Sequence, residues 1–181
     1  MKRLLACVVG LFAALLIAPA FASLTVGAKA PDFSATASMG GKQFKFALAD
    51  AMKKGPVVLY FYPAAFTPGC TIEAHNFADA MPDFEKLGAT VIGVSHDNIQ
   101  TLDKFSLTEC RSKFPVAADS TGKIMKDYDA VSRGDPEYAA RTSYVIAPDG
   151  KVLYTYTAGD PTHHVEYTMA AVQKYVAEHK R

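Results

Sequence analysis

Cys70 is the residue of this chain whose position is best suited to chemistry. It closes the segment PAAFTPGC, residues 63–70, which follows the apolar run VVLYFY at 57–62. That run is β-branched and aromatic, so it predicts a strand buried on both faces, and helical spacing begins after the cysteine. Thr67 suits the N-cap of that helix and Pro68 its first position. Cys70 then lies in the first helical turn, where unpaired backbone N–H groups stabilise a thiolate.

The activation of such a thiol requires more than the helix end supplies. A free cysteine titrates near pH ~8.5, so a mostly ionised thiol at neutral pH needs about 3 to 4 kcal/mol of stabilisation. A helix end contributes typically ~0.3–1 kcal/mol and at most about 2. A hydroxyl and a cation are therefore expected beside the sulfur. Thr67, in the same turn, is the predicted hydroxyl, and the cation must come from a distant part of the chain.

The motif Pro63-x-x-x-Thr67-x-x-Cys70 resembles the active-site signature of the peroxiredoxins. The longer segment FYPAAFTPGCTIEA resembles the peroxiredoxin Q, or bacterioferritin comigratory protein, branch of the alkyl hydroperoxide reductase/thiol-specific antioxidant superfamily. Three further segments extend the likeness over nearly the whole mature chain: GAKAPDFSA at 27–35, ATVIGVSHD at 89–97 and RTSYVIAPDGKV at 141–152.

The resemblance implies a thiol-dependent peroxidase that acts on hydrogen peroxide and organic hydroperoxides. Cys70 would attack the peroxide as a thiolate and become a sulfenic acid. Arg141 would be the missing cation, and with Thr67 and backbone N–H groups it would hold the peroxide oxygens. Pro63 would shield the pocket from water, and Glu73 would orient the arginine. The resemblance implies no metal, haem or flavin cofactor.

The fate of the sulfenic acid depends on a second thiol. Once a leader is removed, Cys70 and Cys110 are the remaining cysteines, and neither belongs to a C-x-x-C pair. Many peroxiredoxin Q proteins carry a resolving cysteine five residues after the reactive one, where this chain has His75. The resemblance leaves Cys110, late in the next long helix, as the resolving candidate. The alternatives are a buried Cys110 that only packs, and a thioredoxin-like or low-molecular-weight thiol as reductant.

The hydrophobic pattern predicts an α/β protein with a thioredoxin-like fold, in which helices flank a central mixed β-sheet. Ile72 and Leu107 are among the apolar residues expected to face the core, and residues 131–140 are expected to form a loop. Strands are predicted at 42–46, 57–62, 90–95 and 116–118, a hairpin at 144–147 and 151–156, helices at 47–54, 71–87, 98–112 and 165–179, and a helical turn at 121–128.

The N-terminus has the pattern of a signal peptide. Lys2 and Arg3 precede an apolar run at 4–18, and Ala-Phe-Ala at 20–22 supplies the small residues of a cleavage site before Ser23. The run is short for a membrane span, which needs about 20 apolar residues. We therefore expect a signal peptide at 1–22, a single domain at 23–181 and a periplasmic location. An uncleaved anchor in the inner membrane, with the domain facing the periplasm, is the alternative.

Composition argues against nucleic acid as a partner. The chain has 19 basic and 18 acidic residues, and removal of Lys2 and Arg3 with the leader leaves 17 basic against 18 acidic. A nucleic-acid-binding domain usually carries a clear basic excess. The sequence leaves a monomer and a homodimer open.

Two other classes of function compete with the peroxidase. A non-catalytic redox sensor or holdase would use the same sulfenic acid as a signal, and turnover with a thiol reductant distinguishes it. A copper-handling protein would use Cys70 and Cys110 with His163 or His164, but it lacks the expected pair of closely spaced cysteines. Both histidines are predicted to lie in a solvated helical turn.

Overall fold

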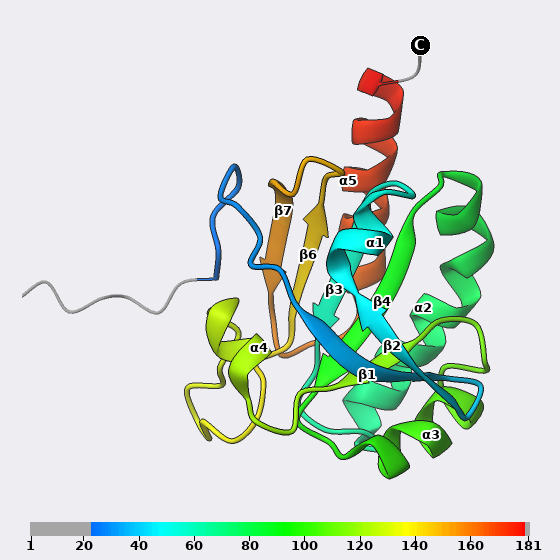
Figure 1. Cartoon of the computed structure of the whole chain (residues 1–181), viewed down its shortest axis with the longest axis vertical. Helices are drawn as coiled ribbons and strands as arrows, with labels where there is room; N and C mark the ends of the chain where they lie inside the picture. The colour runs from blue at the N-terminus through cyan, green and yellow to red at the C-terminus, as the bar shows by residue number, and fades with distance from the viewer. Residues whose placement is uncertain (1–22, 180–181) are drawn as a thin grey trace, which may run out of the picture.

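The computed structural model describes residues 23–179, so the predicted signal peptide at 1–22 lies outside the described residues. Strand β3 (Val57–Phe61) is an inner strand whose five residues are all buried. It pairs in parallel with β4 (Thr90–Ser95) and antiparallel with β6 (Thr142–Ile146). The strand predicted from the run VVLYFY is therefore confirmed, and it lies in the middle of the sheet (Figure 1).

The sheet has seven strands in the described part of the chain, in the order β2-β1-β5-β4-β3-β6-β7. The pairs β3–β4 and β4–β5 are parallel and the remaining pairs are antiparallel, so the sheet is mixed. This confirms the predicted thioredoxin-like α/β fold. The other strands are β1 (Ser34–Met39), β2 (Lys42–Ala47), β5 (Val116–Ala118) and β7 (Val152–Thr157).

Helices cover both faces of the sheet because β3 sends alternate side chains to opposite sides. Val58 and Tyr60 pack with helices α2 (Pro68–Lys86), α3 (Ile99–Thr108) and α5 (His164–His179). On the opposite face, the core that contains Val57, Leu59 and Phe61 includes residues of α1 (Leu48–Met52) and α4 (Lys123–Asp127). Figure 1 shows α2 and α5 side by side on the first face.

Three details of the secondary structure differ from the sequence prediction. Strand β1 was not predicted, and it joins β2 to the rest of the sheet through β5. Helix α3 ends at Thr108 rather than 112, because Arg111 and Ser112 adopt left-handed backbone angles, with φ of 50° and 56°. Ile72 and Leu107 were predicted to face inward, but they are 50% and 55% exposed.

The sheet brings two distant segments together. Strands β3 and β6 are antiparallel, and Phe61 at the end of β3 lies opposite Thr142 at the start of β6. The residue before β6, Arg141, is therefore a neighbour of the loop that follows β3 and leads to Cys70. The predicted hairpin and the predicted cysteine loop meet at this edge of the two strands.

Candidate active site

Cys70 lies in the first turn of α2 and is almost completely buried, at 1% exposure. Thr67 is the N-cap, with extended backbone angles, and Pro68 takes the first helical position, both as predicted. Proline fits there because that position has no intrahelical N–H bond to lose. The proline and the cap therefore begin the helix where the cysteine meets unpaired backbone N–H groups.

Arg141 is the cation beside the sulfur. Its Nη2 lies 3.5 Å from Sγ of Cys70, its Nη1 donates to Oε2 of Glu73, and its Nε donates to the Gly159 carbonyl at 3.0 Å. Both side chains are buried. The structure therefore brings together the three residues that the resemblance implied for the centre of the site, Cys70, Glu73 and Arg141.

Burial decides the electrostatics of the buried pair. Burial raises the pKa of Glu73 to about 8, and the charge and hydrogen bond of Arg141 oppose that rise. Burial alone would lower the pKa of Arg141, but Glu73 and Cys70 outweigh it and hold that pKa above its usual value. The guanidinium stays charged next to a carboxyl group that binds its proton unusually tightly.

Gly69 makes room for the guanidinium. A Cβ atom built at Gly69 would lie 3.0 Å from Nη2 of Arg141, which is tighter than ordinary van der Waals contact. The arginine therefore packs directly on the backbone of the first turn of α2. Sequence reasoning missed this role, although a glycine within the motif was a signal for close approach of another group.

Thr67 and Pro63 are both more exposed than Cys70. The Thr67 side chain is exposed, and its hydroxyl donates to the Ala64 carbonyl at 2.9 Å rather than to the sulfur. The expectation that this hydroxyl hydrogen bonds to Cys70 is therefore wrong for this arrangement, because its single proton is already used. Pro63 is half-buried beside the loop. The loop is anchored where the Ala65 N–H donates to Asp97 at 2.8 Å.

Cys110 is a second buried, free thiol. It lies two residues beyond the end of α3, not within the helix as predicted. It belongs to the same buried cluster as Cys70, Tyr60 and Tyr62. Burial, with a smaller contribution from Glu109, raises the pKa of Cys110. The thiol is therefore neutral at physiological pH while it stays inside.

The turn that carries Cys110 is tied to α2 on both sides. Glu109 interacts with Nε2 of His75 at 2.9 Å, and Nη1 of Arg111 donates to Asp79 at 2.5 Å. His75 and Asp79 are four residues apart, so they lie one helical turn apart on α2. We call these two contacts the Cys110 clamp. His75 is half-buried.

The adjacent histidines at the start of α5 have different environments. His163 is exposed and bonds to Glu166 at 2.9 Å. His164 was predicted to be solvated, but it is fully buried. The ring lies against β6, where it bonds to Ser143, and the tertiary packing of α5 on the sheet overrides the polar character of the residue. Adjacent residues of a helix point in different directions, and the sequence did not show that His164, rather than His163, is the one that faces the sheet.

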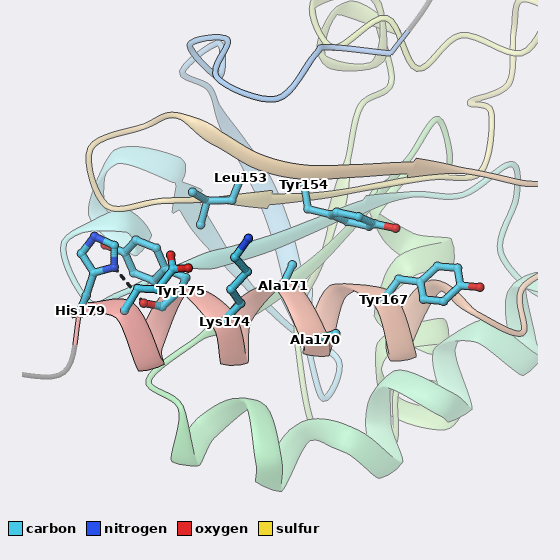
Figure 2. A pocket seen from close by; sticks show the side chains of 9 residues that line it. Leu153, Tyr154, Tyr167, Ala170, Ala171, Lys174, Tyr175 and His179 are labelled. Carbon is cyan, nitrogen blue, oxygen red and sulfur yellow. Dashed lines mark hydrogen bonds between the residues drawn. The ribbon is translucent and has the colours of Figure 1, made fainter.

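One groove of the described residues lies away from Cys70 and Arg141. It has a volume of about 470 Å³ and is formed between β7 and α5 by side chains such as Leu153, Tyr154, Tyr167 and Tyr175 (Figure 2). No cysteine lines it. Within residues 23–179, no three His, Cys, Asp or Glu side chains gather in a way that could hold a metal ion, and no helix could cross a membrane.

Comparison with known proteins agrees with this geometry. The pattern of the AhpC/TSA family matches residues 26–155. Peroxiredoxin Q of Sedum lineare is 31% identical over 154 residues, which cover 84% of this chain and 80% of the relative. Peroxiredoxin Bcp of Xanthomonas campestris pv. campestris is 27% identical over 127 residues, which cover 67% of this chain and 79% of the relative.

A solved structure extends the similarity to three dimensions. The crystal structure of peroxidoxin BcpB from Mycobacterium tuberculosis superposes with a TM-score of 0.75 at 29% sequence identity, and the match covers 82% of this chain and 96% of the other. The chain therefore belongs to the AhpC/TSA family, in the peroxiredoxin Q and Bcp branch, and it is a thiol-dependent peroxidase.

Proposed function

We propose that Cys70 is the residue that reduces the hydroperoxide, with Arg141 as the cation that activates it. The main support for this proposal is the position of the buried Arg141 guanidinium, which is bonded to Glu73 and lies 3.5 Å from the Cys70 sulfur. A thiol in the first turn of a helix and beside a permanent cation is favoured as a thiolate, the form that attacks peroxides.

The proposed reaction begins when the Cys70 thiolate attacks the terminal oxygen of a hydroperoxide. An S–O bond forms as the O–O bond breaks, so the sulfur becomes a sulfenic acid and the peroxide becomes an alcohol, or water. The leaving oxygen takes a proton from solvent. Arg141 stabilises the negative charge that develops on that oxygen. Thr67 is the proposed second peroxide ligand, because its hydroxyl can rotate away from Ala64.

A thiol completes the cycle. It condenses with the sulfenic acid, which forms a disulfide and releases water. Thiol–disulfide exchange then restores Cys70: a Cys70–Cys110 disulfide takes two thiol groups of the reductant, a mixed disulfide with an external thiol takes one more, and the reductant leaves as its own disulfide. Cys110 is the proposed internal thiol because it shares a buried cluster with Cys70. A thioredoxin-like protein or a low-molecular-weight thiol is the proposed external reductant. Whichever thiol acts first, the chain itself supplies the peroxidatic sulfur.

Two cysteine variants test this assignment. Cys70→Ser is expected to abolish peroxide turnover with excess thiol reductant, because the attacking sulfur is gone. Cys110→Ser is expected to keep the first oxidation at the parental rate. Mass spectrometry after one equivalent of hydrogen peroxide measures both steps. Equal loss of the first step in the two variants would contradict the assignment, and parental oxidation without turnover would indicate a redox sensor or holdase.

We also propose that the protein is exported to the periplasm and cleaved before Ser23. The support is the sequence pattern of residues 1–22. Expression of the full chain in a Gram-negative host, followed by fractionation and N-terminal mass spectrometry, tests the proposal. A mature N-terminus at Ser23 in the periplasmic fraction is expected. An intact N-terminus in the inner-membrane fraction would favour the anchored form.

A further inference from the structure

His164 is a buried imidazole that contacts three separate parts of the chain. Its Nε2 lies 3.1 Å from the Ala158 carbonyl, and its Nδ1 lies 2.8 Å from the Ser143 hydroxyl and 3.6 Å from Oε1 of Glu73. A carbonyl can only accept, so Nε2 carries the proton and Nδ1 accepts from the Ser143 hydroxyl. Burial lowers the pKa of His164 to about 4, so the ring is neutral at pH 7.

One route from this ring to Arg141 runs through the turn after β7. The Gly159 carbonyl accepts from Nε of Arg141 at 3.0 Å, and the Ala158 N–H donates to the Arg141 carbonyl at 3.2 Å. The same Ala158 presents its carbonyl to His164. The imidazole therefore holds the Ala158–Gly159 segment, which is hydrogen-bonded to both the backbone and the side chain of Arg141.

A second route runs through Glu73. One carboxyl oxygen, Oε2, binds Arg141, whereas the other, Oε1, has no hydrogen-bond partner among the described residues. The polar edge of His164 faces that free oxygen. Oε2 accepts from Arg141 and Glu73 keeps its proton at neutral pH, so Oε1 carries that proton and presents it toward the lone pair of Nδ1. An apolar side chain in place of the ring would remove this polar neighbour of the buried O–H group, which is costly.

We propose that His164 is a positioning residue for the peroxidase reaction. It holds the Ala158–Gly159 segment, faces the free oxygen of Glu73, and so keeps the Arg141 guanidinium beside the Cys70 sulfur. This inference rests on the proposed roles of Cys70 and Arg141. The imidazole acts through the arginine, because its polar contacts are with Ala158, Ser143 and Glu73 rather than with the sulfur.

Substitutions at 164 and its neighbours separate this role from a general effect on folding. His164→Leu is expected to slow the oxidation of Cys70 about tenfold, because both routes to Arg141 are lost. His164→Gln keeps an amide donor for Ala158 and is expected to recover most of the rate. Ser143→Ala removes only one hydroxyl and is expected to slow the reaction about threefold.

His163→Leu is the matched control, because the adjacent side chain is exposed and bonds to Glu166. It is expected to react at the parental rate. The chain contains no tryptophan, so the rate is best followed by rapid quenching with an alkylating reagent and mass spectrometry of the Cys70 peptide after addition of hydrogen peroxide. Thermal unfolding of each variant reports its folding separately.

A combined variant decides whether His164 acts through the arginine. In a chain that already carries Arg141→Met, His164→Leu is expected to cause no further loss of rate, because the group it positions is absent. A further tenfold loss there would show a general structural effect and would overturn the inference. If His164→Leu and Ser143→Ala both react at the parental rate while Arg141→Met is slow, the proposed role of His164 is overturned but the proposed roles of Cys70 and Arg141 stand. A parental rate for Arg141→Met would instead contradict the proposed site.

Discussion

At the scale of single residues, the site combines groups that the chain keeps far apart. Cys70 and Arg141 are 71 positions apart in the sequence, yet sulfur and guanidinium approach to 3.5 Å. Each of the three donor nitrogens of the arginine has a partner: the sulfur, the Glu73 carboxyl and the Gly159 carbonyl. A side chain that is buried and bonded in this way has one available orientation, so its charge is placed before a peroxide arrives.

Arg141→Met is expected to slow the reaction of Cys70 with hydrogen peroxide about 100-fold. The reason is that the variant keeps the length of the side chain but removes the charge that stabilises the thiolate and the leaving oxygen. Peptide-level mass spectrometry of quenched samples measures the rate. Lys151→Met, which removes an exposed cation, is the control and should react like the parent. A parental rate for Arg141→Met would mean that another group activates the thiol.

Gly69→Ala is expected to separate activity from stability. The added Cβ would lie 3.0 Å from Nη2 of Arg141 and shift the guanidinium by a few tenths of an ångström without breaking its bond to Glu73, so oxidation of Cys70 should slow about tenfold. Stability should not fall, because alanine is favoured over glycine in helices by up to about 1 kcal/mol. Gly134→Ala is the control, since its nearest neighbour lies 3.9 Å away. A slow but unstable Gly69→Ala protein would contradict this explanation.

Prediction from sequence succeeded for the residues within the motif and failed for residues that only tertiary contacts define. Cys70 and its helical turn follow from local pattern, and Arg141 and Glu73 follow from the family resemblance. The burial of His164 depends on how α5 packs on β6, which no local spacing reports. The Thr67 hydroxyl was misplaced because the Ala64 carbonyl competes for its one proton.

At the scale of elements, α2 is the centre of the chemistry. Its first turn carries Cys70, and its next two turns hold the Cys110 clamp through His75 and Asp79. A disulfide between Cys70 and Cys110 requires a Cα separation of about 4.4–6.8 Å, so both thiols must reach a shared position. Opening of the clamp would expose Cys110. Arg111 and Ser112, which follow this cysteine, have left-handed backbone angles that cost conformational energy, and opening would relieve that cost.

The double variant Asp79→Asn/Glu109→Gln is expected to increase the alkylation rate of Cys110 in the native protein by about two- to thirtyfold. Each of the two contacts contributes ~0.2–1 kcal/mol, and that energy is lost from the closed state. Mass spectrometry of the Cys110 peptide over time measures the rate. Asp83→Asn, which breaks the Asp83–Lys86 pair on the same helix, is the control. An unchanged rate would show that apolar packing alone keeps Cys110 inside.

The boundaries of elements show why sequence prediction stops where it does. Strands β3 and β4 were predicted because their residues are apolar, and β6 was predicted as one arm of a hairpin that alternates around the turn at 148–150. All three are inner strands of the sheet. Strand β1 was missed because the side chains of SATASM are small and mostly polar. Its backbone pairing with β2 and β5 holds it in the sheet. Helix α3 ended early because Arg111 and Ser112 turn left-handed, which their side chains do not signal.

At the scale of the whole molecule, two buried groups couple stability to pH. The folded pKa of Glu73, about 8, lies above its ordinary value of 4.5, so Glu73 stabilises the fold at low pH and loses that contribution as pH rises toward 8. The folded pKa of His164, about 4, lies below its ordinary 6.5, so its contribution is lost as pH falls from 6.5 to 4. The two slopes oppose each other below pH 6.5.

Between pH 6.5 and 8 the loss from Glu73 is therefore unopposed by His164. The free energy of unfolding is expected to decrease by about 2 kcal/mol over this range, and Glu73→Gln is expected to remove most of that decrease. Urea unfolding followed by circular dichroism at several pH values measures both. Glu166→Gln, an exposed carboxylate near the start of α5, is the control. Equal pH dependence in the parent and in Glu73→Gln would contradict a raised pKa for Glu73.

The pairing of Phe61 with Thr142 has a consequence for folding quality control. A slip of two residues between β3 and β6 would preserve which side chains face each layer, so the hydrophobic core would tolerate it better than a slip of one. It would nevertheless carry Arg141 roughly 7 Å along the strand, away from the sulfur. The rate at which Cys70 reacts with peroxide therefore reports the register between β3 and β6. Refolded material that regains its circular dichroism but reacts slowly with peroxide would contain misregistered sheets.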